Sequence, residues 1–229
     1  MTNTENNLTL EELRERIEYL ESFLLESRIN TLNNALDMRT EYLTVMTENM
    51  FHAQNASAIV RHCEAFGVQN LHTVEDDCPF LPTLNIALGT DKWIDIKRHA
   101  NTTEAIKDLR NEGYRIIATT PHKQSCTPET FDVKKGKFVL VFGTEKTGVS
   151  KEIMAEADEF LQIPMCGMVD SLNVSASAAI LIYMLSQRMR LECDDWRLSD
   201  EKRTRTLYDW YRFAVRDSEA LLERKFNAK

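Results

Sequence analysis

One segment of the chain, residues 137–183, limits the possible folds more than any other. It contains two apolar runs, Phe138 to Phe142 and Phe160 to Ile163, and after each run come a glycine-containing loop and then a helix pattern. The first loop runs from Gly143 to Gly148, and the second runs from Pro164 to Asn173. Two consecutive strand, loop and helix units predict an α/β protein with a mostly parallel sheet.

The two loops are predicted to form a ligand site, because open α/β sheets bind ligands at the carboxyl ends of their strands. Gly143, Gly148 and Gly167 allow positive φ angles and a close approach of a ligand to the main chain. Neither loop contains a Walker motif or a GxGxxG fingerprint, which argues against an ordinary nucleoside triphosphate or dinucleotide site.

The rest of the chain alternates strand and helix patterns between helical ends. An amphipathic helix is expected from Leu8 to about Leu36, with Thr9 as its N-cap and Glu12 three residues later. Asn55 can cap a further helix, in which Arg61 would lie one and a half turns along. We expect an N-terminal helical extension at 1–40, a central domain at 41–190 and a C-terminal helical extension at 191–229. Further strands are expected at 42–46, 71–75, 93–97 and 114–119, and further helices at 56–66, 102–111, 174–190 and 199–226.

The charge distribution bears on the kind of partner. The net charge is −8, and residues 1–50 carry 4 Lys and Arg against 10 Asp and Glu. A basic surface favours nucleic acid, so RNA binding would depend on local basic patches. The histidines and the five cysteines lack metal-ligand spacing, and no apolar run approaches the ~20 residues that span a bilayer. We expect a cytoplasmic protein that binds neither a metal nor a membrane.

Three motifs occur in order along the chain: NASAIVR from Asn55 to Arg61, FGTEKTGVS from Phe142, and IPMCGMVDSLNVSASAAI from Ile163. They resemble the three motifs of the SpoU/TrmH family of SPOUT RNA methyltransferases, and the similarity covers about residues 42–190. The resemblance implies a SPOUT-type sheet with a C-terminal deep trefoil knot, a homodimer, and S-adenosylmethionine held by the loops that follow three strands.

The resemblance also implies a set of site residues. Arg61 corresponds to the catalytic residue of the family, although an arginine is a poor base because its pKa is above ~12. Arg61 and Lys92 are the candidates for RNA contact. The other candidate catalytic residues are Asn55, Glu145, Ser171 and Asn173. The candidate cofactor-binding residues are Thr119, Phe142, Gly143, Gly148, Ile163, Pro164, Met165, Ser171 and Leu172.

The implied reaction is methyl transfer from S-adenosylmethionine to a ribose 2′-hydroxyl of RNA. The substrate implied first is tRNA, at the D-loop guanosine of position 18, and ribosomal RNA is the alternative. A non-catalytic RNA-binding module is a third hypothesis, and a small-molecule α/β enzyme is a fourth. Gln54 stands where close relatives commonly have histidine, so the chain departs from the family pattern beside Asn55.

Overall fold

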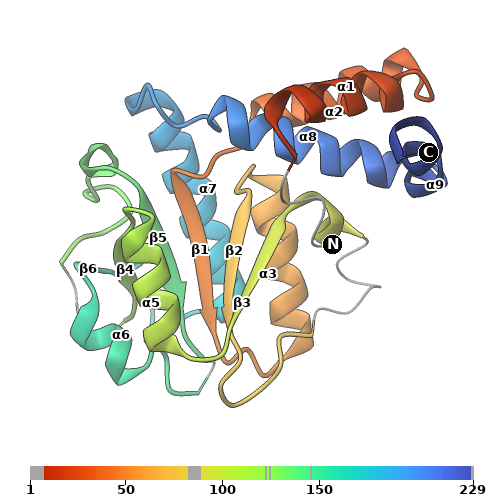
Figure 1. The fold of residues 1–229 in the computed structure, drawn as a ribbon. Helices are drawn as coiled ribbons and strands as arrows, with labels where there is room; N and C mark the ends of the chain where they lie inside the picture. Colours follow the sequence, from red (N-terminus) through yellow and green to blue (C-terminus); the bar gives the residue numbers. More distant parts are fainter. Residues whose placement is uncertain (1–7, 82–88, 122, 124, 145, 228–229) are drawn as a thin grey trace. The chain divides into compact units, whose positions relative to one another are not determined.

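The computed structural model describes residues 8–81, 89–121, 123, 125–144 and 146–227. The chain divides into two compact units. Residues 40–196 form a unit that contains the sheet, and residues 1–39 together with 197–229 form a helical unit (Figure 1). The segments expected as separate N-terminal and C-terminal extensions therefore both contribute to the helical unit.

The sheet has six strands in the order β3-β2-β1-β5-β4-β6. Every pair of neighbouring strands is parallel, and in the middle of the sheet Val45 lies opposite Leu71 on one side and Leu140 on the other. The strands are β1 (Leu43–Glu48), β2 (Asn70–Val74), β3 (Asp95–His99), β4 (Arg115–Thr119), β5 (Phe138–Phe142) and β6 (Glu159–Leu161). Strands β2 and β3 lie on one side of β1, whereas β4, β5 and β6 lie on its other side, so the strand order switches between β1 and β5. Sheets of α/β proteins bind ligands at such switch points.

Helices cover both faces of this sheet, which explains why β1, β2 and β5 are buried along their whole length and why β5 is apolar throughout. Leu140 and Phe142 of β5 belong to a core cluster on the face of α3 and α7, whereas Val139 and Val141 pack with α5 and α6 on the other face (Figure 1). The helical elements of this unit are α3 (Ala53–Ala65), η2 (Thr90–Trp93), α5 (Thr102–Asn111), η3 (Val133–Lys135), α6 (Lys151–Glu156) and α7 (Val174–Glu192).

The expected elements are largely confirmed, with shifts at their ends. Helix α5 has the predicted bounds, because the Asn101 side chain accepts from the Glu104 backbone N–H and Gly113 follows with φ +84°. The strand predicted at 93–97 is displaced, since Trp93 ends the short helix η2 and β3 starts at Asp95.

The helical unit contains more helices than predicted. Its elements are α1 (Leu10–Glu21), α2 (Glu26–Asp37), α8 (Asp200–Ala214), α9 (Ser218–Leu222) and η4 (Glu223–Asn227). The predicted capping box of Thr9 and Glu12 is confirmed. The single helix predicted at 8–36 is wrong, since the chain breaks at Ser22–Leu25, and the one predicted at 199–226 ends at Val215, before Asp217 adopts φ +56°.

Apolar packing between chain ends holds the helical unit together. Leu13, Ile17 and Leu20 of α1 are buried, as are Tyr208 and Trp210 of α8, and α1 packs along α8. Arg14 adds an ion pair with Asp200, with 2.6 Å between Nη2 and Oδ2. No helix of the described residues is long and apolar enough to cross a membrane.

Candidate functional site

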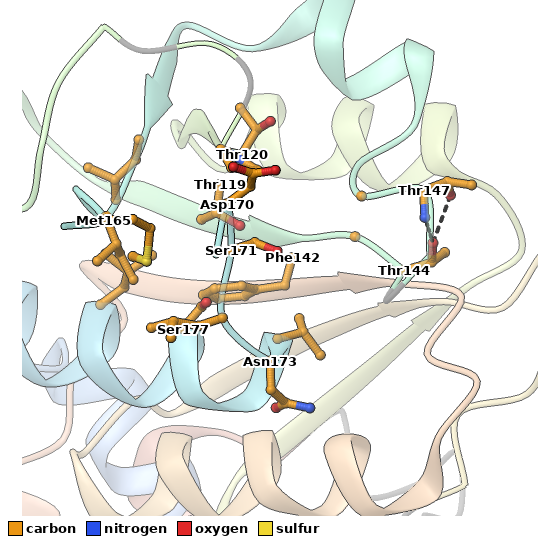
Figure 2. Close-up of a pocket in the computed structure, with 18 of the residues that line it drawn as sticks. Thr119, Thr120, Phe142, Thr144, Thr147, Met165, Asp170, Ser171, Asn173 and Ser177 are labelled. Atoms are coloured by element: carbon orange, nitrogen blue, oxygen red, sulfur yellow. Dashed lines mark hydrogen bonds between the residues drawn. The ribbon is translucent and has the colours of Figure 1, made fainter. Parts of the chain in front are cut away.

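A cavity of about 400 Å³ opens at the carboxyl ends of β4, β5 and β6 and beside the start of α7 (Figure 2). It lies at the edge of the sheet where the sequence places its two loops. The residues that line it are Thr119, Thr120, Pro121, Phe142, Gly143, Thr144, Lys146, Thr147, Gly148, Leu161, Ile163, Met165, Asp170, Ser171, Leu172, Asn173, Val174, Ser177 and Leu181.

The loop after β5 closes tightly on itself. The backbone N–H of Thr144 donates to the Gly148 carbonyl at 2.9 Å, and Gly148 N–H donates back at 3.1 Å. A Cβ on Gly143 would lie 2.0 Å from the carbonyl carbon and oxygen of Gly148, so only glycine fits at position 143. Glycine is required at position 148 for a different reason: its φ is +70°, a left-handed backbone conformation that residues with a side chain rarely adopt. Gly167 does not use the positive φ that glycine allows, and no protein atom lies near an added Cβ there, so the close approach of a ligand at Gly167 stays a prediction.

A buried carboxylate fixes the far end of this loop. Glu48, at the end of β1, is 2% exposed and accepts hydrogen bonds from Ser150 N–H at 2.8 Å and from the Thr102 hydroxyl at 2.6 Å. The Ser150 side chain in turn caps α6. The loop after β5 is thereby tied to the neighbouring strand β1, which gives the cavity a fixed wall.

Asn173 joins the loop after β6 to two helices. Its Oδ1 accepts from Ser175 N–H at 2.8 Å and caps α7, while its Nδ2 donates to Asn55 Oδ1 at 3.3 Å. Asn173 is therefore the N-cap of α7 as well as a candidate catalytic residue. The cap considered for Asn55 is wrong, because α3 starts earlier, with His52 as its N-cap, and this places Asn55 inside the first turn, 8% exposed.

Arg61 lies on α3, six residues beyond Asn55, and is exposed. Neither of these two residues lines the cavity, although Asn173 connects Asn55 to its rim. Beside Arg61, burial lowers the pKa of His62, and the positive charge of Arg61 lowers it further. A neutral imidazole is therefore favoured next to this cation.

The structure brings most of the predicted cofactor residues together. Thr119, Phe142, Gly143, Gly148, Ile163, Met165, Ser171 and Leu172 all line the cavity. Pro164 is exposed and is not among the lining residues, Lys92 is exposed on η2, and Glu145 lies outside the described residues.

Sequence reasoning missed several polar lining residues: Thr120, Lys146, Thr147, Asp170 and Ser177. Asp170 directly precedes Ser171, so its position beside a recognised motif residue was an available signal. Among the described residues, the group suited to hold a metal ion is His99, Glu104 and Asp108, and none of these lines the cavity.

Comparison with known proteins identifies the family. The model of the SpoU rRNA Methylase family matches residues 42–183. A tRNA (guanosine(18)-2′-O)-methyltransferase of Borreliella burgdorferi is 32% identical over 207 residues, covering 90% of this chain and 94% of that protein.

Solved structures agree with this assignment. The crystal structure of the Aquifex aeolicus TrmH/SpoU tRNA modifying enzyme has a TM-score of 0.73 and 32% identity, covering 84% of this chain and 98% of that one. An AdoMet-bound rRNA methyltransferase from Sinorhizobium meliloti has a TM-score of 0.60 and 28% identity, over 69% of this chain and 60% of that one. The cavity, the Asn55–Asn173 pair and these similarities lead to one conclusion: the chain belongs to the SpoU methylase family.

Proposed function

We propose that this protein is an S-adenosylmethionine-dependent RNA ribose 2′-O-methyltransferase that acts on guanosine 18 in the D-loop of tRNA. The observation that carries the proposal is the cavity, which is built by the motif loops of a chain that matches a tRNA (guanosine(18)-2′-O)-methyltransferase over nearly its whole length. A cytoplasmic location is part of the proposal, and it is supported by relatives that are named as tRNA methyltransferases.

The cavity suits S-adenosylmethionine in size and lining. About 400 Å³ falls in the range of small-molecule pockets, and a lining that includes Phe142, Ile163 and Leu181 offers apolar surface to an adenine ring. Gly143 and Gly148 bring backbone groups to the cavity without side chains in between. We propose that the cofactor is bound by the predicted residues that line the cavity and by the neighbouring Pro164. The lining residues of this set are Thr119, Phe142, Gly143, Gly148, Ile163, Met165, Ser171 and Leu172. When bound, this cofactor supplies an electrophilic methyl group on a sulfonium centre.

The chain's own residues would prepare the ribose hydroxyl, which is a poor nucleophile at neutral pH. Asn55 and Asn173 are joined by a hydrogen bond at 3.3 Å, which places two amide side chains together at the rim of the cavity, where they would orient a ribose. Arg61 is exposed and charged, so it can hold the adjoining RNA phosphate and stabilise negative charge that develops on the oxygen. Ser171 and Glu145 complete the proposed catalytic set, and Lys92 is the proposed additional RNA contact.

A trefoil knot is part of this proposal, supported by the path of the chain after β6. Strand β6 is at the sheet edge beside β4, whereas the next helix, α7, packs against α3 on the other half. The connection passes residues 126–131: Gln162 N–H donates to Cys126 O at 3.1 Å, and Arg188 of α7 donates to the carbonyls of Pro128 and Phe131. The same loop therefore contacts the chain before and after the chain crosses from β6 to α7. This arrangement supports a connection that passes through the loop, as a trefoil knot requires.

A homodimer is also proposed. Exposed apolar side chains in the loop after β6 and on α7 support it, because such surface favours burial by a partner. Met168 and Val169 in the loop after β6 are 105% and 59% exposed, and Tyr183 on α7 is 52% exposed. In such a dimer Arg61 of one subunit would act beside the cofactor of the other.

The test is methyl transfer from labelled S-adenosylmethionine to unmodified tRNA and ribosomal RNA transcripts, with each 2′-O-methyl group mapped to its nucleotide. We expect a signal at guanosine 18 of tRNA and none on a tRNA in which another base replaces that guanosine. Methylation of ribosomal RNA alone would favour the second candidate substrate, which the description of the matching family model supports.

The Arg61→Ala variant separates binding from chemistry. It should bind S-adenosylmethionine nearly as well as the unaltered chain and lose roughly 100-fold or more of its methyl transfer. Lys92→Ala is the companion variant, and we expect it to weaken tRNA binding with little effect on kcat. Unchanged turnover of Arg61→Ala would remove Arg61 from the mechanism.

A further inference from the structure

We propose that Asp170 binds the α-ammonium group at the amino-acid end of S-adenosylmethionine and thereby sets the affinity for the cofactor and its product without taking part in methyl transfer. This inference rests on the proposed function and assigns a residue to which neither the sequence motifs nor the comparisons give a role. Three observations carry it.

The first observation is the charge of the cavity lining. Among the described lining residues, only Asp170 and Lys146 are charged, and they come from two different loops. The amino-acid end of the cofactor carries one ammonium and one carboxylate group, whereas its adenosine end is neutral. One acidic and one basic side chain in an otherwise uncharged lining therefore match that end of the ligand.

The second observation is that the Asp170 carboxylate is available. Several other polar side chains of the lining are already engaged: Thr119 donates to a backbone carbonyl at 2.7 Å, Thr144 and Thr147 bond to each other, and Asn173 caps α7. No described residue forms a hydrogen bond or an ion pair with Asp170. An ionised carboxylate is an acceptor with several lone pairs, and a cationic N–H donor is its strongest partner.

The third observation is where Asp170 lies. Figure 2 shows its carboxylate on the side of the cavity near Thr119 and Thr120, whereas Asn173 lies at another side, toward α3. The reacting ribose is proposed to bind near Asn55 and Asn173. Asp170 is therefore placed away from the atoms between which the methyl group moves.

Charge considerations distinguish the ammonium from the sulfonium as the partner. Methyl transfer removes the positive charge from sulfur, so a carboxylate beside the sulfonium would stabilise the reactant more than the transition state and slow the reaction. The ammonium keeps its charge throughout. A carboxylate placed there stabilises the reactant, the transition state and the product equally, which improves binding without opposing the chemistry.

The experiment is calorimetric titration of the full chain with three ligands. S-adenosylmethionine carries both cationic groups, S-adenosylhomocysteine keeps the ammonium but lacks the sulfonium, and 5′-methylthioadenosine lacks the whole amino-acid end. For Asp170→Asn, which keeps the shape of the side chain, we expect roughly tenfold weaker binding of the first two ligands. Binding of 5′-methylthioadenosine should be unchanged, and this result also shows that the variant's cavity is intact.

The matched control is Asp194→Asn, which removes the same charge from an exposed position outside the cavity and should leave all three affinities unchanged. Steady-state assays add an independent readout. Asp170→Asn should raise the KM for S-adenosylmethionine about tenfold and relieve inhibition by S-adenosylhomocysteine by a similar factor, with kcat nearly constant.

Other patterns would overturn the inference. Equal weakening of all three ligands would place Asp170 at the ribose of the cofactor, and weakening of S-adenosylmethionine alone would place it at the sulfonium. Unchanged affinities would show that Asp170 contacts no part of the ligand. If the unaltered chain bound none of the three, the proposed function itself would fail, and this inference with it.

Discussion

Gly143 and Gly148 are required at the same turn for different physical reasons. At Gly143 a side chain has no room, because its Cβ would lie 2.0 Å from the backbone of Gly148. At Gly148 there is room, since no atom lies within 4 Å of an added Cβ, but φ is +70°. Sequence reasoning found both glycines and assigned them one shared purpose, because the letter G does not distinguish close approach from a left-handed backbone.

Alanine substitutions should separate the two reasons. Gly143→Ala must displace the loop and the cavity wall, and we expect roughly 100-fold lower methyl transfer, since small displacements of bound groups have effects of that size. Gly148→Ala meets only backbone strain and should lower the free energy of unfolding by about 1 kcal/mol. Urea titration and single-turnover assays measure both effects; equal losses for the two variants would contradict this account.

Asn173 caps α7 and also contacts Asn55, so its substitution should lower both the stability of the protein and the rate of methyl transfer. Asn173→Ala deletes the cap of α7 and should cost about 1 kcal/mol of stability. It also removes the amide that donates to Asn55 Oδ1, and we expect methyl transfer to fall by more than the stability loss explains. Asn173→Asp is the informative comparison, because it keeps the cap acceptor but cannot donate to Asn55. If Asn173→Asp retained full activity, the Asn55 contact would have no role in the reaction.

At the scale of elements, the end of β3 holds a buried histidine against α5. His99 Nε2 lies 2.9 Å from His72 Nδ1, and His99 is 5% exposed. Burial lowers the pKa of His99, although the nearby Asp108 carboxylate acts in the opposite direction. The folded chain therefore binds this proton less readily than the unfolded chain does.

The sign of the pH dependence follows from that difference. Below the unfolded pKa of about 6.5 the unfolded state binds more protons, so stability falls as the pH is lowered through this range. Above that pH His99 is neutral in both the folded and the unfolded state, so it no longer lowers the free energy of unfolding. We expect His99→Gln to flatten the dependence of the unfolding free energy on pH between about 7 and 5, as followed by urea titration at several pH values. His52→Gln, at the exposed start of α3, is the matched substitution at a histidine that is not buried.

Elements were predictable where residues mark their ends. Helix α5 was found with its exact bounds because Asn101 and Gly113 flank it. The break between α1 and α2 was not, because apolar residues continue at helical spacing through Leu24 and no proline or glycine interrupts them. The start of α3 was missed for a related reason. The actual N-cap, His52, makes no side-chain cap hydrogen bond, whereas Asn55 is of a residue type that often caps helices but lies inside α3.

At the scale of the whole molecule, the two units should differ in their tolerance of truncation. Residues 40–196 form one unit, and the Thr40 hydroxyl donates to the Trp196 carbonyl at 2.5 Å, which joins its two ends. We expect the fragment 40–196 to fold by itself, with a cooperative thermal transition in circular dichroism. A fragment without such a transition would show that the sheet unit depends on the helices.

Deleting residues 1–39 alone should promote aggregation more than deleting the whole helical unit. A chain that lacks residues 1–39 has lost both α1 and α2, which pack against α8, the helix that carries the buried Tyr208 and Trp210. We expect it to aggregate or to bind hydrophobic dyes more strongly than either the full chain or the fragment 40–196. The fluorescence of Trp210 should shift to longer wavelength in the same variant.

The order in which a ribosome makes the chain gives the helical unit a further consequence. Helices α1 and α2 are synthesised before their partner α8, which starts at Asp200. At about 5–20 residues per second, roughly 10–40 s separate the two events. During that interval Leu13, Ile17 and Leu20 have no α8 to cover them. The nascent chain therefore exposes a short apolar stripe until α8 has been made, and exposed apolar surface of this kind is what a chaperone that acts at the ribosome recognises.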